Sequence, residues 1–149
     1  MASTTIYNNA LLEMARGTLS FPNGAQTDIK VLLVGTGSNY VQSKGHSTLA
    51  EIKALGTNPL IEAAGTGYTT NGKAPATITT TINSTTNAIE VAFDDVSWLS
   101  STIASKGAVI YKASTGALVA YIAFDATVTS SNSTFTVDFI SPLRLLNGA

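Results

Sequence analysis

The sequence predicts a mostly-β single domain: an antiparallel β-sandwich, jelly-roll or immunoglobulin-like, with an N-terminal α-helix and a short second helix. Short alternating apolar segments follow one another from about residue 78 to residue 139, separated by Gly, Asn, Asp and Ser turns. In one of them Ile89, Val91 and Phe93 share a face, and residues 135–139 repeat the pattern. Alternation with a period of two indicates strands with one buried face. Several such strands at short spacing indicate a sandwich or a barrel, of which we expect the sandwich.

The composition predicts one domain whose surface is covered by other protein. At 149 residues the chain is long enough to bury its own core. We expect an N-terminal helix or arm over residues 1–17 and the sandwich over residues 28–149. Charged residues make up 11% of the chain, against about 25% in ordinary soluble proteins. Because such a surface lacks the repulsion that keeps monomers apart, we expect copies of the chain or a partner to cover much of it.

Charge and cysteine usage exclude several function classes. The net charge is −1 and the Lys and Arg residues form no cluster, which gives no electrostatic basis for nucleic-acid binding. The absence of Cys excludes disulfides, thiolate metal sites and thiol catalysis. The chain starts without the basic and apolar stretches of a secretory signal, and its most hydrophobic window, 107–124, is interrupted as in a hairpin. We therefore expect synthesis in the cytoplasm and no membrane partner.

Residues 5–16 have the clearest helical pattern. Thr4 or Thr5 is in position to cap the start of this helix, and Gly17 is in position to end it. A helix at this place either lies on its own domain or forms an arm that packs on a neighbouring subunit. The side chains that recur at three- and four-residue steps, and are expected to form its apolar stripe, are Tyr7, Leu11, Met14 and Ala15.

A strong strand is predicted over residues 28–35, with apolar side chains on both faces. Leu32 and Val34 point one way. The side chains that point the other way are Ile29, Val31 and Leu33. A strand covered on both faces is typical of a central strand or of one that lies beneath a helix.

A second, shorter helix is expected over residues 47–56, where Ser47 is in position to cap the start and Gly56 the end. Its apolar stripe would consist of Leu49, Ile52 and Leu55. A short strand is possible over residues 60–64, within a Gly-rich stretch. From residue 77 onward, strands are expected to follow one another almost without interruption.

The segment DDVSW at 94–98 separates two predicted strands. Asp94 and Asp95 are suited to a strand end or a turn, where a carboxylate accepts hydrogen bonds from nearby backbone N–H groups. Trp98 is the single tryptophan, and we expect it to be a large anchor in the core or at its edge. A subunit contact is the alternative role for this side chain.

The last third of the chain is expected to form a hairpin and a closing strand. The window 107–124 contains two apolar strands separated by a Ser-Thr-Gly turn at 114–116. The apolar residues expected to close the last sheet are Leu143, Leu145 and Leu146.

No residue set that would support catalysis, a metal or a cofactor stands out. His46 is the only histidine and lies in a polar loop without a nucleophile-elbow pattern, so a capping or packing role is favoured. The GTG elements at 35–37 and 65–67 lack the features of a phosphate-binding loop, and their glycines suit turns or close backbone approach. A Ca²⁺ site between loops is conceivable, because aspartates offer hard oxygen ligands, but these residues lack the alternation of an ion-binding loop. The aspartates are Asp94, Asp95, Asp125 and Asp138. We therefore expect a protein that is not an enzyme.

The order of these features resembles a group of small structural proteins from tailed bacteriophages. The GTGYT element and the block from DDV-x-W to AYIAFD are its most specific parts when taken together. The resemblance covers nearly the whole chain. Its matching segments are Asp28 to Val34, Glu62 to Gly72, Asp94 to Trp98, Ala108 to Asp125 and Ser133 to Phe139.

The resemblance implies a virion component, and we expect a capsid cement or decoration protein. Such a protein binds the outer surface of the major capsid shell as a homo-oligomer, often a trimer, and stabilises the head. Its partners would be the major capsid protein and its own copies, and it would be made in the host cytoplasm before it joins the virion. One alternative is a tail or fibre component that binds a receptor or forms a tail ring. An alternative of another class is a carbohydrate-binding or hydrolytic β-domain.

The residues predicted to form the partner interface lie on the N-terminal helix and beside the two GTG elements. We expect Tyr7, Leu11 and Leu12 on the helix, and Tyr40 and Tyr68 beside the GTG elements, to contact the partner. Tyrosine is enriched at protein interfaces. Each of these side chains is equally suited to pack within its own domain.

Overall fold

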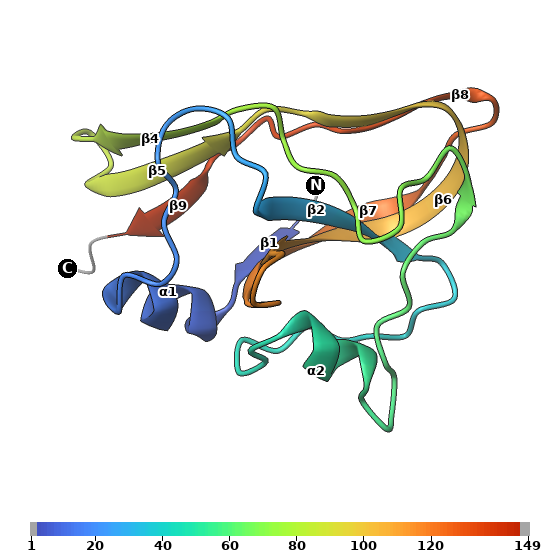
Figure 1. The fold of residues 1–149 in the computed structure, drawn as a ribbon, viewed down its shortest axis with the longest axis horizontal. Helices are drawn as coiled ribbons and strands as arrows, with labels where there is room; N and C mark the ends of the chain where they lie inside the picture. Colours follow the sequence, from blue (N-terminus) through green and yellow to red (C-terminus); the bar gives the residue numbers. More distant parts are fainter. Residues whose placement is uncertain (1–2, 147–149) are drawn as a thin grey trace.

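The computed structural model describes residues 3–146 and contains two antiparallel sheets and two helices (Figure 1). This confirms the predicted mostly-β, sandwich-like class with two helices. In chain order the elements are β1 (Ser3–Ile6), α1 (Asn8–Ala15), β2 (Ile29–Gly35), α2 (Leu49–Lys53), β3 (Gly65–Thr66), β4 (Ile78–Asn83), β5 (Ala88–Phe93), β6 (Val96–Lys112), β7 (Leu118–Thr129), β8 (Ser133–Val137) and β9 (Leu143–Leu146).

The long strand β6 connects the two layers of the sandwich. The large sheet has the order β1-β7-β6-β2, and β3 and β8 pair with other parts of β6. The small sheet has the order β4-β5-β9. The first part of β6 pairs with β8 beside the small sheet, and its second part pairs with β2 and β7 in the other layer (Figure 1). One strand therefore passes from layer to layer.

Buried serines satisfy backbone groups where β6 bends. The β6–β8 register shifts between Trp98 and Ser101. The Ser101 hydroxyl lies 3.0 Å from the carbonyl oxygens of both Trp98 and Ser133, and 2.9 Å from the Ser130 hydroxyl. The Ser130 hydroxyl in turn accepts the backbone N–H of Ile103 at 3.2 Å. Since a buried polar backbone group without a partner is costly, these hydroxyls make the bend compatible with a dry interior.

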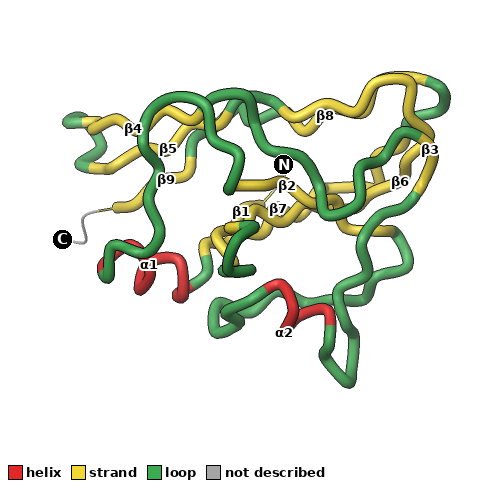
Figure 2. Tube along the Cα trace, viewed as in Figure 1, coloured by secondary structure: helices red, strands yellow, loops and turns green. Residues whose placement is uncertain are grey.

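The large sheet has a core on each face, which gives the molecule three layers. One cluster fills the space between the two sheets, and the other lies between the large sheet and the segment that contains α2. Figure 2 shows α2 and its loops on the side of the large sheet away from β8. Val31 and Leu33 belong to the first cluster, whereas Leu32 and Val34 belong to the second. The prediction that this strand is covered on both faces is confirmed.

The N-terminal helix is shorter than predicted, because residues 3–6 form a strand. β1 pairs with β7, so Thr4 and Thr5 lie in a sheet and the prediction that one of them caps the helix is wrong. β-branched side chains favour an extended backbone, and the edge of β7 offers backbone groups to pair with. Gly17 follows the helix with a φ of 74°, as predicted for its end. Of the helix's own residues Ala10 is buried, whereas Leu11, from the predicted stripe, is exposed.

The second helix begins one residue later than predicted. Thr48, not Ser47, is the N-cap: its hydroxyl accepts the Glu51 N–H, and the Glu51 carboxylate accepts the Thr48 N–H in a capping box. The predicted strand over 60–64 is reduced to a single bridge between Glu62 and Val34. Neither helix within residues 3–146 has the length and apolar character needed to cross a membrane.

Four predictions for the second half of the chain are confirmed. The Asp94–Asp95 pair lies between β5 and β6, and the Asp95 carboxylate accepts the Phe139 N–H at 2.8 Å. β6 and β7 form the predicted hairpin, and β9 closes the small sheet against β5. Trp98 is a core anchor with 2% of its surface exposed.

Replacement of Trp98 by Ala is expected to lower the free energy of unfolding by about 3–5 kcal/mol. The indole packs on Tyr68 and Phe135, with ring centroids at 5.6 and 6.2 Å. Within the described residues its N–H has no hydrogen-bond partner. Trp98→Phe should therefore cost much less, because it keeps an aromatic ring and removes an unsatisfied donor. Urea unfolding followed by circular dichroism measures both variants, and equal losses would contradict this account of the site.

Candidate functional site

The structure separates the five predicted contact residues into two groups. Tyr7 and Tyr40 are buried in the core beneath α2, and Tyr68 is half-buried against the core between the sheets. These three side chains therefore pack within their own domain, which was the alternative to a partner contact. Leu11 and Leu12 are exposed on α1, so a partner contact stays a prediction for them.

Tyr7, Tyr40 and His46 form a hydrogen-bonded chain inside the domain. The two phenolic oxygens are 3.0 Å apart, and the Tyr40 hydroxyl lies 2.8 Å from His46 Nδ1. Burial raises the pKa of Tyr7 far above its usual value, and the hydrogen bond to Tyr40 raises it further. Burial likewise raises the pKa of Tyr40. The chain fastens the loop before α2 to the start of α1, which is the packing role favoured for His46.

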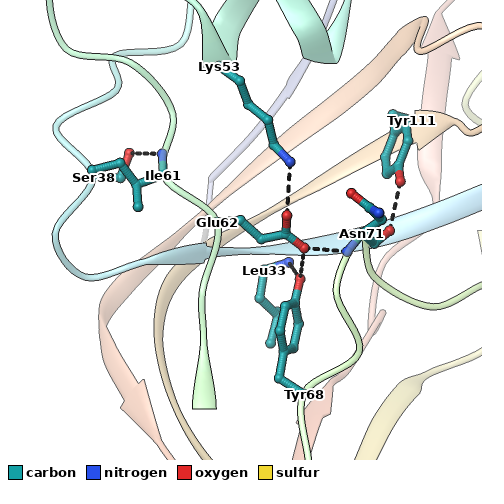
Figure 3. A network of polar contacts seen from close by, with 8 residues as sticks. All are labelled: Leu33, Ser38, Lys53, Ile61, Glu62, Tyr68, Asn71 and Tyr111. Carbon is teal, nitrogen blue, oxygen red and sulfur yellow. Dashed lines mark hydrogen bonds and ion pairs between the residues drawn. The ribbon is translucent and has the colours of Figure 1, made fainter.

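A polar network around Glu62 joins three parts of the chain (Figure 3). One carboxylate oxygen lies 2.9 Å from Nζ of Lys53 on α2. The other accepts the Tyr68 hydroxyl at 2.8 Å and the Asn71 N–H at 2.5 Å. The Tyr68 hydroxyl also accepts the N–H of Leu33 on β2 at 3.2 Å. Burial raises the pKa of Tyr68 well above its usual value, so this phenol stays a neutral donor.

The Glu62 network holds a loop against the outer edge of β2. Val31 and Lys73 exchange both backbone hydrogen bonds, at 2.8 and 3.1 Å, and the Gly35 N–H donates to the Ile61 carbonyl at 2.8 Å. Gly72 has a φ of 78°, and a side chain there would collide with the Val31 carbonyl. Because these contacts occupy the groups that an exposed strand edge would offer, the network has a structural role.

The outer edge of β4 is covered in a similar way. Gly24 and Ile78 exchange two backbone hydrogen bonds of 3.0 Å, and the Asn23 side chain accepts the Thr80 N–H at 2.6 Å. The FPNG segment at 21–24 therefore closes one edge of the small sheet.

The edges of β1 and β9 are open by contrast. Both are edge strands of their sheets, and within residues 3–146 no strand pairs with their outer sides. β1 also covers β7 only along Ala120–Ala123, so the rest of the outer edge of β7 extends beyond it. Within residues 3–146, loops thus cover the outer edges of β2 and β4, whereas no strand pairs with the outer edges of β1 and β9.

A line of adjoining pockets follows these open edges, and we call it the seam. A pocket of about 420 Å³ lies between β7 and β8 and reaches from Phe124 to Asp138. The next two lie between β1 and β9 and have Thr4, Ile6 and Arg144 in common. The β7–β8 pocket is linked to the other two through the sheet, because Thr4, which lines both of them, pairs with Ile122, which lines the first.

The two ends of the seam carry charges of opposite sign. The charged residues that line the β7–β8 pocket are Asp125 and Asp138. Those that line the pockets beside β9 are Lys44 and Arg144. Arg144 also contacts the carboxylate of Glu90 at 3.0 Å and remains about half exposed.

An exposed apolar surface adjoins the basic end of the seam. Ile82, Ile89 and Leu145 form one cross-strand row of the small sheet, and Leu145 lines a pocket together with Leu11 of α1. We call these four residues the end surface. Ile82 is 80% exposed and Ile89 is 46% exposed. The prediction that Ile89 lies on the buried face together with Val91 is wrong, because the row of Ile82, Ile89 and Leu145 lies outside the core cluster that contains Val91.

The aspartates considered for a Ca²⁺ site do not gather into one. In the part of the chain that the structure describes, no group of three or more His, Asp or Glu side chains is placed to hold a metal ion. Asp95 caps the Phe139 N–H, and Asp138 lies at the acidic end of the seam.

The buried tyrosines predict a loss of stability in alkali. Burial raises the pKa of all five tyrosines, Tyr7, Tyr40, Tyr68, Tyr111 and Tyr121. In the unfolded chain tyrosine titrates near about pH 10. Above that pH the unfolded state releases protons that the folded state retains, so stability is complete below about pH 10 and falls as the pH rises. Urea midpoints measured from about pH 8 to pH 11 should show this fall, and Tyr7→Phe should reduce its slope. A flat profile would contradict the burial of these hydroxyls.

Comparisons of the chain with protein-family models, with curated proteins and with solved structures found no match. The phage resemblance therefore stays a prediction from the motifs in the sequence.

Proposed function

We propose that this chain is a phage capsid cement or decoration protein. In this role it binds the outer surface of the major capsid shell as a homo-oligomer, with a trimer as the first expectation, and stabilises the head. The observation that supports this best is the exposed apolar end surface on a chain of which only 11% is charged. A surface of this kind marks a site of protein contact.

The end surface is suited to bind a protein shell. Ile82 and Ile89 present β-branched side chains on a sheet, which is a rigid support, and Leu11 extends the apolar area from α1. Burial of apolar surface contributes roughly 25 cal/mol per Å², and it is insensitive to the salt that screens surface ion pairs. Repeated copies on a shell would add avidity without new contacts. Binding alone would then stabilise the head.

The purified chain mixed with empty phage heads tests this function. Sedimentation of the mixture should bring the chain down with the heads, at a stoichiometry near that of the shell protein. Isolated tails serve as the comparison. A chain that ignores heads and binds tails would establish the tail or fibre alternative, and one that binds neither would overturn the proposal.

The double variant Ile82→Thr, Ile89→Thr should weaken head binding by roughly 10-fold or more, because it removes the exposed apolar row. Threonine keeps the β-branched shape that strands favour, so the urea midpoint should change little. The matched control is Leu99→Thr, since Leu99 is 71% exposed on β6 and lies outside the end surface. Equal loss of binding in the control, or none in the double variant, would place the shell contact elsewhere.

A further inference from the structure

The seam is complementary to a second copy of itself. Its charged lining is acidic at one end, with Asp125 and Asp138, and basic at the other, with Lys44 and Arg144. Asp138 and Arg144 are six residues apart, so at most about 20 Å of chain separates their backbones. When the acidic end of one seam meets the basic end of another, charges of opposite sign face each other. A partner of uniform charge would match only one end.

We propose that the seam is the self-association interface of this protein, with the acidic end of one copy packed against the basic end of the next. The inference specifies how the homo-oligomer of the proposed function forms. It rests on the proposed self-association and not on the proposed binding to the capsid. We infer that a second copy of the chain binds here because each copy carries both the acidic and the basic end that such a contact requires.

Open strand edges give this contact its backbone component. The outer edges of β1 and β9 border the seam, while loops cover the outer edges of β2 and β4. An exposed edge presents a row of N–H and C=O groups that pair readily with another chain. Side chains such as Ile6, Phe124 and Val128 supply apolar area along the same line. The chemistry is therefore that of edge pairing, with charge complementarity fixing the direction.

A stable contact would need only part of the molecule's surface. A standard interface buries about 800 Å² on each partner. The whole molecule exposes 7692 Å², so the contact would use roughly a tenth of it. The end surface shares Leu11 and Leu145 with the seam and keeps Ile82 and Ile89 for another partner.

Charge reversal at the two ends tests the proposal. Lys44→Glu and Asp138→Lys should each raise the dissociation constant for self-association by roughly 10-fold or more, because like charges then face each other. The double variant should restore association, since both ends have changed sign together. Sedimentation equilibrium over a range of protein concentrations measures all three.

The matched controls reverse charges that do not line the seam. Lys30 lies on β2, at the far edge of the large sheet from β1, and Asp94 lies in the turn before β6. Lys30→Glu and Asp94→Lys should leave the dissociation constant within about twofold of the wild-type value, since surface charges outside a contact contribute little to it. Circular dichroism identifies any variant that has not folded, and the double variant guards against that outcome because its recovery requires a folded chain. A wild-type chain that remains a monomer, or a double variant weaker than both single variants, would overturn the proposal.

A mixture of the two single variants distinguishes a two-fold pair from a ring. In a pair, each contact joins one Lys44→Glu copy to one Asp138→Lys copy, so opposite charges meet at both ends and association returns. In a ring of three, two copies of one kind must be neighbours, and one contact always opposes like charges. The mass of the assembly in the mixture therefore distinguishes a two-fold pair from a closed ring. A mixture that associates no more strongly than each single variant alone would count against the seam.

Failure of this inference and failure of the proposed function are distinguishable. A monomer that still binds heads would end the seam proposal and leave the shell-binding function intact. An oligomer that depends on Lys44 and Asp138 but ignores heads would do the opposite.

Discussion

The passage of β6 from one layer to the other is the constraint on which the rest of the structure depends. This strand pairs with β2, β3, β7 and β8, so both layers take their positions from it. A strand that bends sharply loses regular backbone pairing at the bend. Here buried hydroxyls compensate: Ser101 serves the Trp98 carbonyl, and Ser105 lies 2.8 Å from the carbonyl oxygens of Val34 and Gly107. Small polar side chains inside the molecule are thus a condition of its architecture.

The same bend accounts for the open seam. Gly107 pairs with Ala123 whereas Ser105 pairs with Val128, so four residues of β7 bulge out of the β6–β7 ladder. That bulge forms one lip of the pocket between β7 and β8. Because Gly107 packs closely on the Ile122 carbonyl, a side chain there would disturb the pairing on which the bulge depends. The feature that joins the layers thereby also creates the surface proposed for self-association.

The sequence predicted the elements more reliably than it predicted their surroundings. Alternation along residues 28–35 was sufficient to place Leu32 and Leu33 on opposite buried faces, because period-two patterning reports burial directly. The same alternation predicted that Ile89 is buried together with Val91. Ile89 is exposed, because alternation does not report where the core beneath a sheet ends. Tyr7 and Tyr40 were proposed as contacts because tyrosine favours interfaces. Their hydroxyls instead satisfy each other inside the domain, a pairing between residues 33 positions apart that no local pattern encodes.

The treatment of sheet edges argues that the seam is a contact surface and not an unprotected one. Natural sheets block edges with charges, loops or bulges when pairing would be harmful. In this chain a polar network covers the edge of β2: Tyr68 donates to Glu62, and the backbone of Lys73 pairs with β2. Within residues 3–146 no strand pairs with the outer edges of β1 and β9, although charged side chains in the neighbouring pockets could hold a loop there. With charged residues at 11% of the chain, repulsion gives little protection to an open edge. Under these conditions the proposed self-association would also protect the open edges from unspecific pairing.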